Sequence, residues 1–169
     1  MPVKPEVAIV MGSDSDWPLV KKAVETLNEF DVVCDVRVIS AHRTPEEACS
    51  FAAGASKRGI KVIIAAAGGA AHLGGVLAAH TILPVIGIPV KGGALNGMDA
   101  LLATLQMPSG IPVATVTLGS AGPVNAAILA VQMIALARPG LRRKLVSYKR
   151  SLKRKVATGN RNVQRDLTA

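Results

Sequence analysis

Residues 61–72 read KVIIAAAGGAAH, a continuous apolar run that ends at two glycines and a histidine. A short run of Val, Ile and Ala without polar alternation is typical of a strand buried on both faces of a sheet. Similar runs occur elsewhere, and each is followed by a stretch with helical periodicity. The expected strands cover residues 6–11, 32–39, 61–67, 84–90 and 112–118. The expected helices cover residues 18–30, 73–81, 98–106 and 121–137, with one more beginning at Pro45.

Strands that alternate with helices at this spacing predict a parallel sheet with helices on both faces. Because crossovers between parallel strands are right-handed, few topologies remain. We expect a three-layer α/β/α fold, a doubly wound parallel sheet of the flavodoxin-like type with strand order 2-1-3-4-5. The winding then reverses between the first and third strands, and ligands bind beyond the carboxyl ends of the strands at that point.

The composition suits one α/β domain with an aliphatic core. Half of the 169 residues are hydrophobic, yet only four are aromatic, so the core must consist of Ala, Val, Ile and Leu. Residues 100–137 contain no Asp, Glu, Lys or Arg. A membrane span needs about 20 uninterrupted apolar residues, whereas prolines and glycines divide this stretch. We therefore expect no membrane association and a homo-oligomer whose subunits cover part of this surface.

The net charge of +9 is concentrated in the last part of the chain. Residues 1–137 carry nine Lys and Arg against ten Asp and Glu, whereas residues 138–169 carry eleven against one. We expect residues 1–137 to form a single catalytic domain and residues 138–169 to form a basic helix with a frayed tail.

The basic segment also carries an apolar stripe, which favours docking over nucleic-acid binding. The stripe recurs every three or four residues and consists of Leu141, Leu145, Tyr148, Leu152 and Val156. A stripe of this width is normally buried, so we expect a helix docked on its own or a neighbouring subunit. We expect the last dozen residues to fray and do not expect nucleic-acid binding as a function.

The beginning of the chain and its cysteines predict a cytoplasmic protein. Met1 leads through Lys4 and Glu6 into the first apolar run, without the pattern of a signal peptide. Cys34 and Cys49 lack the spacing of a metal site or a redox pair. We expect both thiols to be reduced.

Polar side chains with catalytic potential gather in three loops, each after one of the first three strands. In the first loop, Gly12 allows a tight turn, and Ser13 and Ser15 place hydroxyls beside helix N-terminal N–H groups, which suits an anion. Asp16 can accept hydrogen bonds from a ribose diol. Alternatively, Ser15 or Asp16 is an ordinary helix N-cap.

The second loop, residues 40–45, reads SAHRTP. Arg43 can hold a phosphate through its planar guanidinium. Histidine side chains in general titrate near neutral pH, so a residue of this type at position 42 can both give and take a proton in one cycle. Ser40 is expected to line the same pocket. The alternative for His42 is a plain surface histidine.

The third loop follows residues 61–67 and has almost no side chains. Its backbone can approach a flat ligand closely, and its N–H groups can hold a carboxylate or developing negative charge. The residues expected to line the pocket here are Gly69, Ala70 and Ala71. Close packing of a helix on the sheet is the alternative reason for small residues. His72 either lines the site or caps its helix, and His80 is expected to be structural.

These loops together predict an enzyme or a binding protein for a small phosphorylated ligand. The sequence shows no cluster of metal ligands, no Ser-His-Asp set and no phosphate-binding loop of the nucleoside triphosphatases. We therefore expect neither a metal nor a cofactor.

Four motifs resemble those of one enzyme family. They are MGSDSDW at 11–17, SAHRTP at 40–45, AAAGGAAHL at 65–73 and QMPSGIPVATV at 106–116. Over residues 6–137 the chain is similar in order and spacing to the N5-carboxyaminoimidazole ribonucleotide mutases, also called catalytic subunits of phosphoribosylaminoimidazole carboxylase.

The resemblance implies an isomerase of purine (IMP) biosynthesis that assembles as a homo-octamer. The implied reaction converts N5-carboxyaminoimidazole ribonucleotide to 4-carboxy-5-aminoimidazole ribonucleotide, by decarboxylation and recarboxylation through CO₂ held in the enzyme, without a cofactor. The matching positions make Ser13, Asp16 and Arg43 substrate-binding residues and His42 the catalytic residue.

Two departures and two alternatives remain. Gly74 stands where the family is expected to have proline, residues 91–93 read KGG, and the basic tail is not explained by the motifs. One alternative is a carboxylase that uses aminoimidazole ribonucleotide and free CO₂. The other is a non-catalytic nucleotide- or flavin-binding module.

Overall fold

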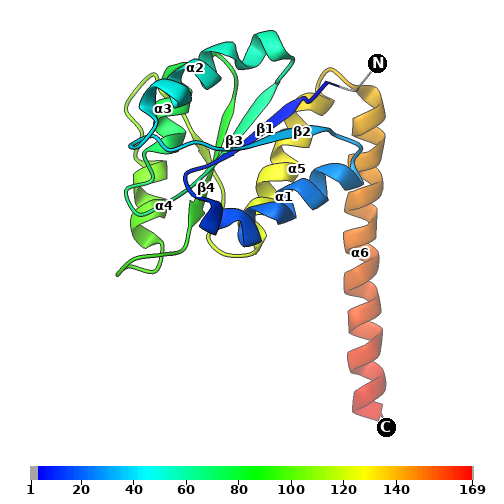
Figure 1. Ribbon diagram of the computed structural model, residues 1–169. Coiled ribbons are helices and arrows are strands. Elements are labelled where there is room, and N and C mark those ends of the chain that lie inside the picture. Colours follow the sequence, from blue (N-terminus) through cyan, green and yellow to red (C-terminus); the bar gives the residue numbers. More distant parts are fainter. Residues whose placement is uncertain (1–3, 169) are drawn as a thin grey trace.

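The computed structural model describes residues 4–168 and contains a five-stranded parallel sheet in the order β2-β1-β3-β4-β5 (Figure 1). The predicted fold class and strand order are confirmed. The strands are β1 (Val7–Met11), β2 (Cys34–Val38), β3 (Val62–Gly68), β4 (Val85–Val90) and β5 (Ala114–Thr115). Residues 1–3 and 169, which the predicted segments 1–137 and 138–169 include, lie outside the described residues.

Helices cover both faces of the sheet and make the three layers (Figure 1). On one face lie α1 (Trp17–Glu29) and α5 (Ala121–Ala135), which also contact each other. On the other face lie α2 (Pro45–Ala55), α3 (Leu73–Ala79) and α4 (Met98–Leu105). Proline opens α2 and stands in the first turn of α1, where its missing N–H has no partner to lose.

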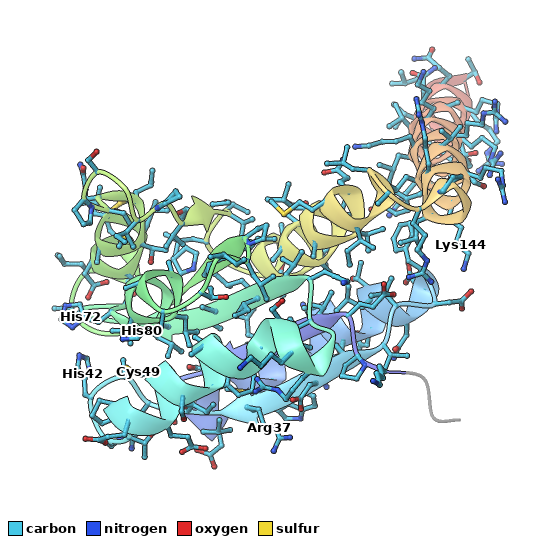
Figure 2. All side chains as sticks on the ribbon, turned by 90° about the horizontal axis from the view of Figure 1, so that it is seen from above. Arg37, His42, Cys49, His72, His80 and Lys144 are labelled. Carbon is cyan, nitrogen blue, oxygen red and sulfur yellow. The ribbon has the colours of Figure 1, made fainter. Side chains whose placement is uncertain are left out.

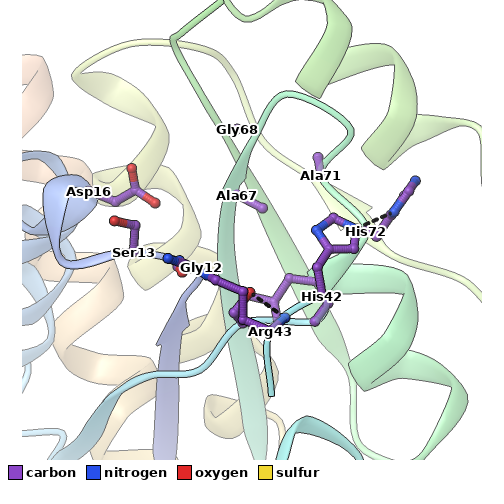
Figure 3. A pocket seen from close by; sticks show the side chains of 12 residues that line it. Gly12, Ser13, Asp16, His42, Arg43, Ala67, Gly68, Ala71 and His72 are labelled. Atoms are coloured by element: carbon purple, nitrogen blue, oxygen red, sulfur yellow. Dashed lines mark hydrogen bonds between the residues drawn. The ribbon is translucent and has the colours of Figure 1, made fainter. Parts of the chain in front are cut away.

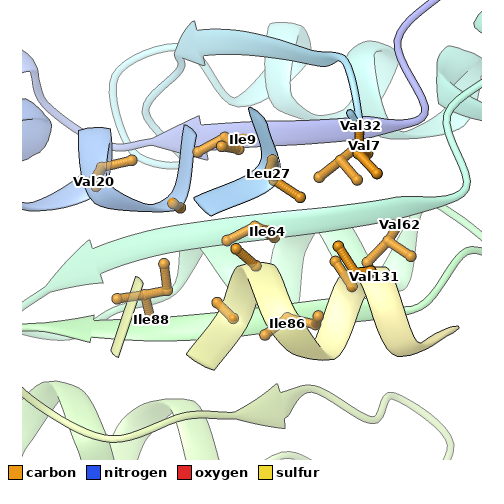
Figure 4. Close-up of a cluster of buried hydrophobic side chains, with 14 of the residues drawn as sticks. Val7, Ile9, Val20, Leu27, Val32, Val62, Ile64, Ile86, Ile88 and Val131 are labelled. Carbon is orange, nitrogen blue, oxygen red and sulfur yellow. The ribbon is translucent and has the colours of Figure 1, made fainter. Parts of the chain in front are cut away.

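The core consists of two aliphatic clusters that share the strands. All five residues of β1 are buried. Val7 and Ile9 belong to the cluster under α1 and α5 (Figure 4), and Ala8 belongs to the cluster under α2 and α3. Helices α2 and α5 meet the sheet mainly through buried alanines. Small contact residues allow helices to approach a sheet closely, which explains how a chain with four aromatic residues still packs densely.

Strand β5 is much shorter than the expected strand at residues 112–118. Only two of its residues pair with β4, and the ladder is extended by one further bond, from Val116 N to the Gly87 carbonyl at 3.0 Å. As the edge strand, β5 has one neighbour, and Pro112 has no N–H to donate. The chain then turns at Gly119, which has a φ of +80°, and enters α5.

The last helix, α6 (Pro139–Thr168), docks through its first ten residues against the part of the chain that the structure describes. Leu141 is 3% exposed, and the ring of Tyr148 meets that of Phe30 edge to face with 5.6 Å between centroids. Ion pairs join Arg138 to Glu6 and Lys144 to Asp31.

The distal half of α6 projects away from the sheet (Figure 1) and leaves Leu152 and Val156 exposed. The expected fraying of the last dozen residues is not seen, since the helix continues to Thr168. Residues 141–168 contain no proline and are rich in Lys, Arg and Leu, and the helix continues through its single glycine, Gly159, which is about 1 kcal/mol less favourable than alanine in a helix. Among the described residues, no helix has both the length and the apolar character that a membrane crossing requires.

Candidate active site

A cavity of about 400 Å³ lies beyond the carboxyl ends of β1, β2 and β3, where the winding of the sheet reverses (Figure 3). All three predicted loops contribute to its wall. The lining residues are Gly12, Ser13, Asp16, Ser40, Ala41, His42, Arg43, Ala67, Gly68, Ala71, His72 and Leu73. The four residues with predicted roles, Ser13, Asp16, His42 and Arg43, are therefore brought together.

Some pocket predictions differ from the structure at single positions. Ser15, Gly69 and Ala70 do not line the cavity. Ser15 instead donates its hydroxyl proton to Ser13 Oγ at 2.9 Å, so it supports a lining residue. Ala41, Ala67 and Leu73 line the cavity but were not among the expected pocket residues, because an apolar side chain next to a polar loop gives no chemical signal in the sequence.

The first loop forms a short 3-10 helix, Asp14–Asp16, whose N-cap is Ser13. Ser13 Oγ accepts the Ser15 N–H at 3.3 Å, so the alternative assignment of Ser15 as N-cap does not hold. Asp16 occupies the N-cap position of α1 but makes no side-chain capping bond. A ligand would therefore not have to displace a capping bond of this carboxylate within the described residues.

The surroundings of Asp16 oppose its negative charge. Burial, followed by repulsion from the Asp14 carboxylate, raises the pKa of Asp16 above its ordinary value.

Gly12 stands at the other side of this loop, and a Cβ there would meet nothing within 4 Å. The space above Gly12 is therefore open to a ligand, and its backbone needs no left-handed conformation.

The second loop is held rigidly by its own hydroxyls. Ser40 N donates to Thr44 Oγ1 at 3.1 Å, and Arg43 N donates to Ser40 Oγ at 3.2 Å. Arg43 Nη2 also donates to the Gly12 carbonyl at 2.8 Å, which ties this loop to the end of β1. A second hollow of about 310 Å³ adjoins the cavity and shares Ser13, Ser40 and Arg43 with it. A guanidinium that lines both hollows together with two serine side chains is a suitable place for an anionic group.

Backbone geometry accounts for the small residues of the third loop. A Cβ at Gly68 would lie 3.3 Å from the Val90 carbonyl oxygen, and Gly69 has a φ of +60°. Ala71 is also left-handed, with a φ of +48°, and it is buried. A non-glycine residue in this conformation is uncommon and is a form of strain that recurs at functional sites. Both the close-packing and the pocket interpretations of this loop therefore apply, at different residues.

His72 lines the site and does not cap α3. It occupies the N-cap position without a side-chain capping bond, and its Nδ1 lies 2.7 Å from His42 Nε2. Figure 2 shows these two imidazoles facing each other at one edge of the molecule. His80 ends α3, where its Nδ1 contacts the Val76 carbonyl at 2.9 Å, and it lies outside the cavity.

The departure from the family pattern at Gly74 has a simple structural setting. Gly74 is the second residue of α3, where a proline is tolerated because the N–H there has no partner within the helix. A Cβ at Gly74 would be in ordinary contact with Val113 and Ala65.

Within residues 4–168, no three His, Cys, Asp or Glu side chains gather as a set of metal ligands.

The fold and the site define a class of protein. A doubly wound α/β chain with hydroxyls, an arginine and a titratable histidine at the switch point of its sheet belongs among the enzymes and binding proteins for small phosphorylated ligands. The sequence profile described as AIR carboxylase matches residues 6–155. The chain belongs to the AIR carboxylase family, which confirms the resemblance inferred from the four motifs.

Curated relatives cover nearly the whole chain. The N5-carboxyaminoimidazole ribonucleotide mutase of Mycobacterium tuberculosis strain H37Rv is 54% identical over 96% of this chain and 92% of its own length. The mutase of Pyrococcus horikoshii is 55% identical over 90% of this chain and 85% of its own. The crystal structure of Treponema denticola PurE superposes with a TM-score of 0.81 and 31% identity, covering 91% of this chain and 95% of that one.

Proposed function

We propose that this protein converts N5-carboxyaminoimidazole ribonucleotide to 4-carboxy-5-aminoimidazole ribonucleotide in purine biosynthesis, as an isomerase that moves a carboxylate within its substrate. The observation that carries the proposal is the convergence of Ser13, Asp16, His42 and Arg43 on one cavity. The relatives that share more than half of their residues with this chain are named mutases for this carboxyaminoimidazole ribonucleotide.

In this proposal the phosphate of the substrate lies against Arg43, with the hydroxyls of Ser13 and Ser40 beside it. These three residues line both the main cavity and the adjoining hollow, so the phosphate sits where the two meet. Asp16 accepts hydrogen bonds from the ribose, because its carboxylate lines the cavity without a capping bond. The aminoimidazole ring then reaches the part of the cavity between His42 and the third loop.

His42 performs the two proton transfers in opposite directions. As the bond between the carboxylate carbon and the exocyclic nitrogen breaks, its electrons return to that nitrogen, which takes a proton from His42, and CO₂ is released. Ring carbon four then attacks CO₂ and afterwards gives up its proton to His42. One imidazole can do both because an imidazole can give and take a proton within one cycle, and the protons balance over that cycle.

The third loop retains CO₂ between these two steps. Ala67, Gly68 and Ala71 form a wall of small residues on this side of the cavity. Such a wall offers CO₂ a small apolar space and leaves backbone groups near the developing carboxylate. No cofactor enters the proposal, because an aminoimidazole is itself a carbon nucleophile.

The runner-up is a carboxylase that adds free CO₂ to aminoimidazole ribonucleotide, and AIR carboxylase is the name of the family to which the chain belongs. The names of the relatives favour the mutase over this activity and over a non-catalytic nucleotide- or flavin-binding module. The decisive experiment measures turnover of both ribonucleotides by the purified protein, with and without bicarbonate and EDTA. The mutase predicts turnover of the N5-carboxy compound without added bicarbonate and in the presence of EDTA. Bicarbonate-dependent turnover of aminoimidazole ribonucleotide alone would identify a carboxylase.

The proposal includes a homo-octamer, as the family resemblance implies, and a cytoplasmic location. An apolar surface on α4 and the preceding loop supports assembly, since Leu95, Met98, Leu102 and Leu105 are each about half exposed or more. Leucines of this exposure in adjacent turns form a patch of the kind that subunit interfaces cover. The distal half of α6 adds Leu152 and Val156 to the uncovered apolar surface. We propose that these surfaces contact other copies of the chain, and that nucleic acid is not a partner.

A further inference from the structure

The apolar stripe of α6 continues beyond the docked part of the helix. Leu141, Leu145 and Tyr148 pack on the core, and the same spacing repeats eleven residues further on. Eleven residues make about three turns of an α-helix, so each repeat falls on the same face. The later members lie on the half of α6 that projects away from the sheet (Figure 1). They are Leu152, Val156, Gly159, Val163 and Leu167.

These five later residues, the distal strip, are uncovered. The exposed fractions are 40% for Leu152, 74% for Val156, 57% for Val163 and 74% for Leu167. A Cβ added at Gly159 would meet nothing within 4 Å. The distal strip runs for about 22 Å along the helix. An apolar face of this length on a helix is normally buried against another surface.

The spacing of the distal strip is the same when it is read in either direction. Leu152 and Leu167 are equally far from a midpoint just after Gly159, and so are Val156 and Val163. A two-fold axis at this midpoint would place leucine against leucine and valine against valine in an antiparallel pair of helices. Gly159 would stand at the crossing, where the lack of a side chain lets two backbones approach closely.

We propose that the distal strip pairs with the distal strip of a second copy of the chain, antiparallel and about a two-fold axis just after Gly159. Such a contact needs a self-complementary surface, which the strip provides. The inference rests on the proposed assembly and not on the proposed reaction. Two strips this short bury less than the roughly 1,200 Å² of a standard interface. The pairing therefore joins subunits that the rest of the assembly already holds near one another.

Most of the positive charge in this half of α6 lies away from the distal strip. At about 100° per residue, four arginines fall on the opposite face of the helix. In the pair, the arginines of the two copies are separated by the width of both helices, roughly 20 Å. This exceeds the distance of about 8 Å over which charges act at physiological ionic strength. The four are Arg150, Arg154, Arg161 and Arg165.

The lysines beside the distal strip meet no like charge across the two-fold axis. Lys153 and Lys155 flank the strip on opposite sides. In the antiparallel pair, Lys153 comes beside Gln164 of the second copy, and Lys155 comes beside its Asp166, the one acidic residue of 138–169. The two copies of Lys149 lie at opposite ends of the pair. In a parallel pair, by contrast, Lys153 would come beside Lys155 of the second copy, so the charges favour the antiparallel direction.

The test is disulfide crosslinking of the full-length protein, read as chain dimers on denaturing gels after mild oxidation. Asn160→Cys places a thiol next to the two-fold axis, where the two copies of this position come close enough to form a disulfide. Arg161→Cys is the matched control, because this residue lies on the opposite face of the helix. Wild-type protein controls for the two free cysteines, Cys34 and Cys49.

Two further positions test the direction of the pair. In the antiparallel arrangement the two copies of residue 152 are about 22 Å apart, whereas residue 152 meets residue 167 of the second copy. Leu152→Cys and Leu167→Cys should therefore each fail to crosslink alone, and the double variant should crosslink. Crosslinking of Leu152→Cys with itself would indicate a parallel pair and would overturn the proposal.

We expect Asn160→Cys to convert most chains to dimers, with or without nuclease, and Arg161→Cys and wild type to remain single chains on the gel. Equal crosslinking of Asn160→Cys and Arg161→Cys would indicate random collision and would overturn the pairing. So would a crosslink that nuclease abolishes, because nucleic acid would then bridge the helices. An oligomer in which Asn160→Cys does not crosslink would overturn the pairing alone. A wild-type protein of monomer mass would overturn it together with the assembly, while mutase turnover by that protein would leave the proposed reaction standing.

Discussion

Arg43 Nη2 donates a hydrogen bond to the carbonyl oxygen of Gly12 at 2.8 Å, across 31 positions of the chain. This bond joins the loop that carries His42 to the loop that carries Ser13. The same guanidinium contacts Ser40 Oγ through Nε at 3.4 Å and lines both hollows of the site. Arg43 therefore shapes the site before any ligand arrives, besides offering charge to a phosphate.

Arg43→Ala should raise KM by about tenfold or more while kcat changes less, because a charge-assisted hydrogen bond contributes about 1.5–3 kcal/mol and a phosphate is held equally in the ground and transition states. Steady-state kinetics with the N5-carboxy ribonucleotide measures both constants. Arg37→Ala is the control, since Arg37 is exposed on β2 and pairs with Asp35. A collapse of kcat with unchanged KM would contradict the phosphate role.

His42→Asn should keep the fold and the affinity for substrate but lower turnover by at least about a hundredfold, the usual contribution of a general acid–base residue. His42 lies on the second loop and faces the third loop, whereas Asp16 lies on the opposite side of the cavity (Figure 3). Single-turnover kinetics and substrate titration separate the two effects. Turnover within tenfold of wild type would remove His42 from the mechanism.

Asp16→Asn should weaken substrate binding and yet raise the melting temperature at neutral pH. Burial and Asp14 raise the folded-state pKa of Asp16, so its ionised form destabilises the native state relative to the unfolded chain. As the pH falls through this raised pKa, the native state takes up the proton first and the penalty disappears. The stability gain of the variant should therefore shrink on acidification. Melting curves at neutral and acidic pH test this, and a gain that grew on acidification would contradict it.

Leu102→Glu should break the oligomer. Leu102 is 50% exposed on the outer face of α4, in a region without charged residues beyond Asp99. Placing a carboxylate in an apolar interface leaves it desolvated and unpaired, which is strongly unfavourable. Light scattering at micromolar concentration measures the mass, with Ala53→Glu on exposed α2 surface as the control. A wild-type protein of monomer mass would refute the assembly itself.

Two truncations divide the roles of α6. Removal of residues 138–169 deletes Leu141 and Tyr148, so it should lower the melting temperature, because burying one such leucine contributes about 1.5–3 kcal/mol. Removal of residues 152–169 keeps the buried start of α6 and deletes the exposed half of the helix. We expect this shorter truncation to keep the fold of the subunit but weaken the oligomer.

The shorter truncation also distinguishes the two interpretations of the basic helix. Unchanged assembly, stability and activity would make the distal half an independent appendage and would favour nucleic acid as its partner. Weak binding to polyanions that salt abolishes would not do so, because charge alone produces it.

The regular elements could be predicted because each depends on a local pattern. The apolar run of β3 and the prolines at the beginning of α1 and α2 are visible in the sequence, and their positions agree with the structure. The length of β5 could not be predicted, because it depends on tertiary pairing with a single neighbouring strand. In the described ladder, β5 pairs with two residues of β4, Ile86 and Gly87. The path of α6 could not be predicted either, because the apolar stripe in its sequence is the same whether or not another surface covers it.

For the site, the sequence by itself determined which residue types follow the first three strands, and the rule that parallel strands end at one edge predicted that Ser13, His42 and the third loop would meet. Only the tertiary structure decided that His72 faces His42, that Ser15 supports Ser13 from behind and that Arg43 holds Gly12. The physical reason is one of scale. A pattern of apolar and polar residues fixes an element and its place in a sheet to within a few ångströms, whereas a hydrogen bond forms within a few tenths of an ångström. That precision comes from the left-handed turn at Ala71 and the packing of α3 against the sheet, which involve residues far apart in the chain.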